Sequence, residues 1–79
     1  MFLEKVIWMS PNENILIVTG NSYYGERNEV IYKVFTKKRF YLFNSNEFYK
    51  EDWIMQYWFD DINAAFNFAS MLKDEVENN

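Results

Sequence analysis

Residues 53–77 read WIMQYWFDDINAAFNFASMLKDEVE, and the spacing of their apolar side chains changes midway. Trp53–Phe59 is a short run rich in aromatic residues, which is typical of a β-strand. Across Ile62–Glu77 the apolar residues recur with the helical period of about 3.6, and Asp60 or Asp61 is placed to cap a helix N-terminus. The segment therefore predicts a strand that is followed directly by a helix, with an early turn of helix as the alternative for Trp53–Phe59 because short apolar runs fit both.

The predicted helix carries one apolar stripe that can lie against a sheet. The stripe consists of Ile62, Ala65, Phe66, Ala69, Leu72 and Val76. Phe68 and Met71 lie off this stripe and are surplus to the simplest core. The strand alternation places Trp53, Met55, Tyr57 and Phe59 on one face of the sheet, and Ile54, Gln56 and Trp58 on the other.

Four more strands are expected upstream, at Phe2–Met9, Ile15–Thr19, Glu29–Thr36 and Phe40–Phe43. The unbroken apolar run ILIVT predicts a central strand that is covered on both faces. Residues 20–28 are rich in turn formers and predict a loop, Lys37–Arg39 predict a hairpin tip, and Phe48–Asp52 a connector. The expected fold is one α+β domain over residues 1–79, in which a single C-terminal helix packs on one face of an antiparallel sheet of four to five strands.

Charge is distributed unevenly along this chain of net charge −4. Residues 1–43 carry six basic and four acidic side chains, a net of +2, whereas residues 44–79 carry two basic and eight acidic, a net of −6. Such a field favours a partner with a basic surface. The chain has no cysteine, no signal-peptide pattern and no apolar run long enough for a membrane span, so we expect a cytoplasmic protein.

The chain contains neither histidine nor cysteine, the side chains most often used near neutral pH for proton transfer, nucleophilic attack and transition-metal binding. The carboxylate pairs at Glu51-Asp52, Asp60-Asp61 and Asp74-Glu75 are adjacent in sequence, so the two side chains of each pair diverge. We therefore expect no enzymatic activity, no cofactor and no metal site.

Seventeen of the 79 residues are aromatic, more than one small core covered on one face by a helix would need. Aromatic and methionine side chains are enriched in protein interfaces. We therefore expect a binding surface for a protein partner or for a second copy in a homodimer. Its candidate residues are Tyr23, Tyr24, Tyr49, Trp58 and Phe68.

In size and single-domain layout the chain resembles small phage-encoded accessory proteins, including anti-CRISPR and other anti-defence inhibitors. The resemblance extends over the whole chain without a shared motif, so it assigns no functional residue. It implies a stoichiometric inhibitor in the bacterial host cytoplasm, directed at a defence or nucleic-acid-handling protein.

The alternative function is nucleic-acid binding through the predicted hairpin tip. Lys37, Lys38 and Arg39 can contact phosphates, while Tyr32, Tyr41 or Phe43 would provide rings for base stacking. The negative C-terminal half opposes this binding, so a protein ranks before nucleic acid as the expected partner.

Overall fold

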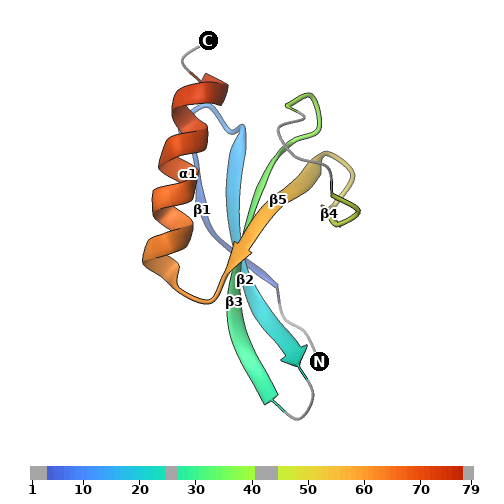
Figure 1. Ribbon diagram of the computed structural model, residues 1–79. Helices are drawn as coiled ribbons and strands as arrows, with labels where there is room; N and C mark the ends of the chain where they lie inside the picture. Colours follow the sequence, from blue (N-terminus) through green and yellow to red (C-terminus); the bar gives the residue numbers. More distant parts are fainter. Residues whose placement is uncertain (1–3, 25–26, 41–44, 78–79) are drawn as a thin grey trace.

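The computed structural model describes residues 4–24, 27–40 and 45–77, with side chains at all of these except 22–24, 27 and 28. Its elements are β1 (Lys5–Met9), β2 (Ile15–Tyr24), β3 (Arg27–Lys37), β4 (Phe48–Tyr49), β5 (Trp53–Phe59) and α1 (Ile62–Glu77). The strands form one curled antiparallel sheet in the order β1-β2-β3-β5-β4 (Figure 1). The α+β class predicted from the sequence is confirmed.

The central strand β2 is covered on both faces, as its unbroken apolar sequence predicts. Ile15 and Ile17 pack on the side of α1, whereas Leu16 and Val18 belong to a separate cluster on the opposite face. None of these four side chains is more than 1% exposed. Because successive side chains of a strand point to opposite faces, β2 contributes equally to two cores.

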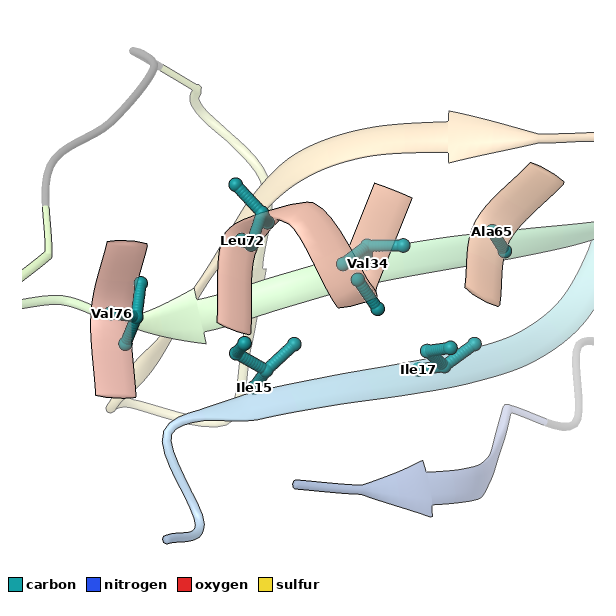
Figure 2. Packing of buried hydrophobic residues seen from close by; sticks show 7 residues of the cluster. Ile15, Ile17, Val34, Ala65, Leu72 and Val76 are labelled. Carbon is teal, nitrogen blue, oxygen red and sulfur yellow. The ribbon is translucent and has the colours of Figure 1, made fainter. Parts of the chain in front are cut away.

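The helix α1 closes one face of the sheet with small and aliphatic residues (Figure 2). The buried cluster between them consists of Ile15, Ile17, Val34, Ala65, Ala69, Leu72 and Val76. Ala65 and Ala69 have no side-chain atoms beyond Cβ, which lets the helix come close to the strands. At the β1 side of the helix, the ring of Phe66 meets Trp8 edge-on with centroids 5.9 Å apart.

The helix begins and ends where the sequence predicts, at Ile62 and Glu77. The carboxylate of Asp61 accepts a hydrogen bond from the backbone N–H of Ala64 at 2.9 Å, so Asp61 is the N-cap residue. Ile62 was expected to belong to the apolar stripe but is 39% exposed. Phe68, expected off the stripe, is half-buried against the core.

The face opposite α1 is closed by a second buried cluster, formed by Leu16, Val18, Phe35 and Trp53. Tyr49 of β4 packs against Phe35 with ring centroids 5.8 Å apart. Lys33 lies on this same face, since its register partner in β2 is Val18. It makes ion pairs with Glu4, at 3.4 Å, and with Glu47. These pairs join the residue before β1 to the residue before β4.

A buried serine links the β1–β2 turn to the C-terminal end of the helix. Ser10, at the end of β1, is 2% exposed, and its hydroxyl accepts hydrogen bonds from the backbone N–H groups of Asn14 and Ile15, both at 3.1 Å. The same hydroxyl donates a hydrogen bond to the carboxylate of Glu77 in the last turn of α1. The β1–β2 turn and the C-terminal end of the helix are thereby held together.

The loop predicted at residues 20–28 is wrong over most of its length. β2 and β3 continue to Tyr24 and from Arg27, and their pairing is unbroken from Ile15 opposite Thr36 to Tyr24 opposite Arg27. This two-stranded hairpin extends beyond β1 and β5 (Figure 1). Cross-strand hydrogen bonding in a regular register outweighs the weak strand propensity of glycine, asparagine and serine.

The hairpin predicted between Glu29–Thr36 and Phe40–Phe43 is also wrong. β3 pairs with β5 instead, with Thr36 opposite Ile54, and Phe40 lies outside any strand. Residues 41–43 fall outside the described residues. The short strand β4 forms within the segment that was predicted to be a connector. Likewise, β1 begins at Lys5 rather than at Phe2, which is outside the described residues.

A β-bulge in β5 changes which side chains share a face. Phe35 is opposite Met55 and Val34 is opposite Tyr57, so Gln56 is an extra residue without a partner position in β3. The strict alternation predicted for β5 is therefore broken at Gln56. Trp53, Met55 and Trp58 lie on the face opposite α1, and Ile54, Tyr57 and Phe59 lie on the face of α1.

Candidate functional site

Three aromatic rings from β5 and α1 form a compact group on the helix side of the molecule. The centroids of Tyr57 and Phe59 are 5.1 Å apart, those of Phe59 and Phe68 are 5.5 Å apart, and those of Tyr57 and Phe68 are 6.0 Å apart. These are favourable distances for tilted aromatic pairs. The group exists because the bulge at Gln56 turns Tyr57 and Phe59 towards α1.

The ring group extends onto an exposed surface. Tyr57 is 57% exposed, although two of its neighbours are aromatic rings. Met71 follows Phe68 by three residues, so it lies on the same side of the helix, and it is 65% exposed. We call Tyr57, Phe59, Phe68 and Met71 the aromatic surface. Large apolar side chains exposed next to one another are a feature of interaction sites.

Acidic residues flank the aromatic surface at both ends. Asp60 and Asp61 come directly after Phe59 and precede the helix. Glu75 lies one helical turn beyond Met71 and therefore on the same side of α1. A partner that covers this surface meets carboxylates at both ends.

The structure separates the residues that the sequence predicted to form one interface. Phe68 belongs to the aromatic surface, whereas Trp58, 38% exposed, lies on the opposite face of the sheet, across from Lys33. Tyr49 is half-buried against Phe35 in the second cluster. Tyr23 and Tyr24 lie in the extended part of β2, and their side chains are outside the described part.

Sequence reasoning did not predict three residues of the aromatic surface, namely Tyr57, Phe59 and Met71. Tyr57 was grouped with Trp53 and Met55, because an alternation pattern contains no information about a bulge. Met71 was noted as lying off the helix stripe, and that position was a usable signal for an exposed site. Phe59 was assigned to the same face as Tyr57, and the structure bears this out.

A second candidate site lies at the end of β3. Its three basic residues belong to the N-terminal part of the chain, residues 1–43, which has a net positive charge. Lys37, Lys38, Arg39 and Asp52 line an open depression of about 300 Å³, which we call the basic depression. The turn is held by a hydrogen bond of 2.9 Å from the backbone N–H of Lys38 to the carbonyl of Asp52. The sequence predicted the three cations as a group but not the hollow between them.

Each cation of the basic depression rests on an aromatic ring. The Nζ of Lys37 is 4.4 Å from the ring centroid of Trp53, and the Nζ of Lys38 is 5.1 Å from that of Phe48. The guanidinium carbon of Arg39 is 5.0 Å from the ring centroid of Phe40. Cation–π contacts fix the charged groups without cancelling their charge.

Arg39 has a further neutral partner. Its Nη2 donates a hydrogen bond of 2.8 Å to Oδ1 of Asn14, a side chain that is only 8% exposed. Among the described residues, no ion pair is found for the cations of the basic depression. Three positive charges are therefore positioned in a hollow that holds one carboxylate, that of Asp52.

Of the three rings predicted for base stacking, Tyr32 does not lie beside these cations. Tyr32 lies on the face of α1, where it packs against the first core cluster, whereas Lys37 lies opposite Trp53 on the other face. Tyr41 and Phe43 are outside the described residues. Among the described residues, the rings beside the cations are those of Trp53, Phe48 and Phe40.

The described residues lack the features of a metal site and of a membrane-spanning helix. The described residues contain no group of three or more acidic, histidine or cysteine side chains that could hold a metal ion. No described helix has both the length and the apolar character needed to cross a membrane. Comparison of the chain with protein families, curated proteins and solved structures gives no significant match. The aromatic surface and the basic depression are therefore the features of the described chain that bear on its function.

Proposed function

We propose that this protein is a non-enzymatic protein-binding module that acts by covering a partner with its aromatic surface. The observation that supports this function is the exposure of Tyr57 and Met71, each more than half exposed, next to the rings of Phe59 and Phe68. An exposed rim around partly buried rings provides apolar area that water leaves on binding. Tyrosine and methionine are among the residues enriched at such interfaces.

The proposed partner is a protein whose apolar contact patch is bordered by lysine or arginine. This follows from the carboxylates of Asp60, Asp61 and Glu75 at the ends of the aromatic surface, and from the net charge of −6 over residues 44–79. Complementary charge accelerates encounter and selects among partners more than it adds affinity. The apolar contacts are therefore expected to dominate the affinity, and the charges its salt dependence.

The narrower proposal is that of a stoichiometric inhibitor encoded by a phage and acting in the bacterial cytoplasm on a defence or nucleic-acid-handling protein. It is supported by the resemblance in size and layout to anti-defence proteins, and by a surface that needs no catalytic group. Proteins that handle nucleic acid carry the basic surfaces that an acid-flanked patch would meet.

The test is capture of partners from a bacterial lysate by three forms of the protein. The double variant Tyr57→Ser/Met71→Ser removes the two most exposed side chains of the aromatic surface. The matched control Val6→Ser/Met9→Ser removes two exposed apolar side chains, 36% and 42% exposed, from β1 on the other face. We expect the first variant to lose the partner held by the wild type, with at least about thirtyfold weaker affinity, and the control to keep it.

Two further measurements complete this test. Circular dichroism should show an unchanged fold for both variants, since the replaced side chains are exposed. Light scattering coupled to size exclusion decides whether the partner is a second copy of the chain. Retention of capture by the Tyr57/Met71 variant together with its loss in the β1 control would place the interface elsewhere and overturn the proposal.

A further inference from the structure

The basic depression has no role in the proposed function, because it lies on β3 and the turn after it and contains none of the residues of the aromatic surface. It nevertheless has the elements of a binding site. It is hollow, its cations are held in place, and their charge is not neutralised by ion pairs within the described residues. The volume of about 300 Å³ is at the lower end of the range for small-molecule sites.

The cations are positioned before any ligand arrives. Lys37 and Lys38 rest on Trp53 and Phe48, and Arg39 is held both by a ring and by Asn14. Long basic side chains otherwise lose considerable conformational entropy when they bind. Prior positioning reduces that loss, and neutral partners leave the full positive charge for an anion.

Donor capacity is also left over at this site. Arginine has five N–H groups, and the bond to Asn14 uses one of them. Each lysine has three N–H donors, while an aromatic face attracts the ammonium group as a whole. The site can therefore donate several charge-assisted hydrogen bonds at once, which is the way in which phosphate oxygens are bound.

The ring faces argue against a stacked base as the recognised group. Lys37, Lys38 and Arg39 each lie over one face of Trp53, Phe48 and Phe40, respectively. A base would have to displace a cation in order to stack on that face. The ligand that fits these contacts is compact, highly charged and rich in oxygen acceptors.

We propose that the basic depression is a binding site for a compact oligophosphate, either free or as the phosphate chain of a nucleotide. Lys37, Lys38 and Arg39 bind the phosphate oxygens. Asp52, the one carboxylate of the lining, opposes the ligand's charge and limits the affinity. This site works independently of the aromatic surface.

Isothermal titration of the full chain with inorganic tripolyphosphate at constant ionic strength tests the site. The triple variant Lys37→Gln/Lys38→Gln/Arg39→Gln should bind at least about thirtyfold more weakly, because charge-assisted hydrogen bonds are lost. The control Lys5→Gln/Lys50→Gln/Lys73→Gln has the same net charge and should bind like the wild type. If the triple variant does not fold, the single change Lys38→Gln, at an exposed side chain, should still weaken binding about fivefold.

Removing a negative charge, instead of a positive one, distinguishes a defined phosphate site from general attraction between the ligand and a positively charged protein. Asp52→Asn should tighten tripolyphosphate binding about threefold, because it removes a repulsive charge from the lining. Asp60→Asn removes the same charge outside the depression and should leave the affinity unchanged. Equal effects of the two substitutions would overturn the proposal.

Titrations with other ligands show whether the site binds free oligophosphate, a nucleotide or nucleic acid. Adenosine should not bind, and equal affinities for tripolyphosphate and ATP would support a site for phosphate alone, whereas tighter ATP binding would support a nucleotide site. Absence of saturable tripolyphosphate binding would overturn the proposal. Single-stranded DNA that binds more tightly than tripolyphosphate, with an affinity that rises with its length, would also overturn it and assign the cations to nucleic-acid binding.

Discussion

The two faces of the sheet are closed by different means. On one face, α1 packs its small and aliphatic residues onto β2 and β3, in a geometry that follows from a regular helical period. On the other face, the cluster around Phe35 and Trp53 is bordered by Tyr49 of a two-residue strand and crossed by the ion pairs of Lys33. Elements far apart in sequence must meet to build this second face.

The difference shows how a chain of this size uses so many aromatic residues. A helix covers only one face, so aromatic side chains take over the role of a second layer on the other. Phe35 is 1% exposed and Trp53 7% exposed without a helix above them. The two candidate sites lie at the margins of these cores, the aromatic surface beside the helix face and the basic depression beside Trp53.

The largest expected effect is the loss of stability when a buried valine on either face of the sheet is replaced by alanine. Val18 and Val34 are both 0% exposed and lie on opposite faces of neighbouring strands. Each Val→Ala change removes buried methyl groups and leaves a small cavity, so each should lower the free energy of unfolding by about 2 kcal/mol. Urea denaturation followed by tryptophan fluorescence measures both values.

Equal losses for the two valines would show that both faces are packed cores. A loss at Val18 well below that at Val34 would mean that the second face is loosely packed and open to water. In that case the comparison between a helix-closed and an aromatic-closed face would fail.

The next effect concerns the link between the β1–β2 turn and the helix end. Ser10→Ala removes a buried hydroxyl that accepts two backbone hydrogen bonds and donates one to Glu77. Two buried N–H groups then lose an acceptor, so the free energy of unfolding should fall by about 1.5 kcal/mol. Hydrogen exchange of the Asn14 and Ile15 amides should accelerate more than that of amides in β5. Uniform acceleration throughout the sheet would contradict a local link.

The smallest expected effect is the loss of stability when the ion pairs of Lys33 with Glu4 and Glu47 are removed. The Lys33 side chain is 15% exposed. Burial lowers its pKa, but the hydrogen bond and charge of Glu47, together with those of Glu4, outweigh burial and raise the pKa above its ordinary value of 10.5. The charged form is therefore favoured by folding. Its contribution is fully present below pH 10.5 and is lost as pH rises through the higher pKa of the folded state.

Lys33→Met should lower the free energy of unfolding by less than about 1 kcal/mol at pH 7, the usual value for an ion pair whose acidic partners are open to solvent. The difference between wild type and variant should shrink as the pH rises past 10.5. Urea denaturation from pH 8 upwards measures it, and taking the difference cancels the titration of the tyrosines. A difference that grows with pH would contradict the assigned sign.

The sequence predicted those parts of the fold that depend on local patterns. The bounds of α1, a helix cap at Asp60 or Asp61, the bounds of β5 and the two-sided burial of β2 follow from periodicity and short-range hydrogen bonding. Residues 20–24, 27 and 28 were misassigned to a loop, because their turn-forming composition was weighed without the partner strand that holds them extended. The pairing of β3 with β5 across a long connection gave no local signal.

The candidate sites were predicted to a smaller extent. The sequence grouped Lys37, Lys38 and Arg39 because they are consecutive, and the structure keeps them together around one depression. Trp58 and Phe68 were grouped because both seemed surplus to the core, yet they lie on opposite faces of the sheet. An excess of aromatic residues can be counted from the composition, whereas the surface on which each residue lies depends on the register of strand pairing.

The sequence by itself determined an α+β chain with a capped C-terminal helix, a two-sided central strand and a charge that changes sign along its length, since each of these depends on neighbouring residues. Only the tertiary structure decided the bulge at Gln56, which brings Tyr57 to Phe68 and turns Trp58 away. It also decided which rings lie beneath the cations of the basic depression. These features arise from pairing between distant strands, where one inserted residue reverses the direction of every side chain that follows.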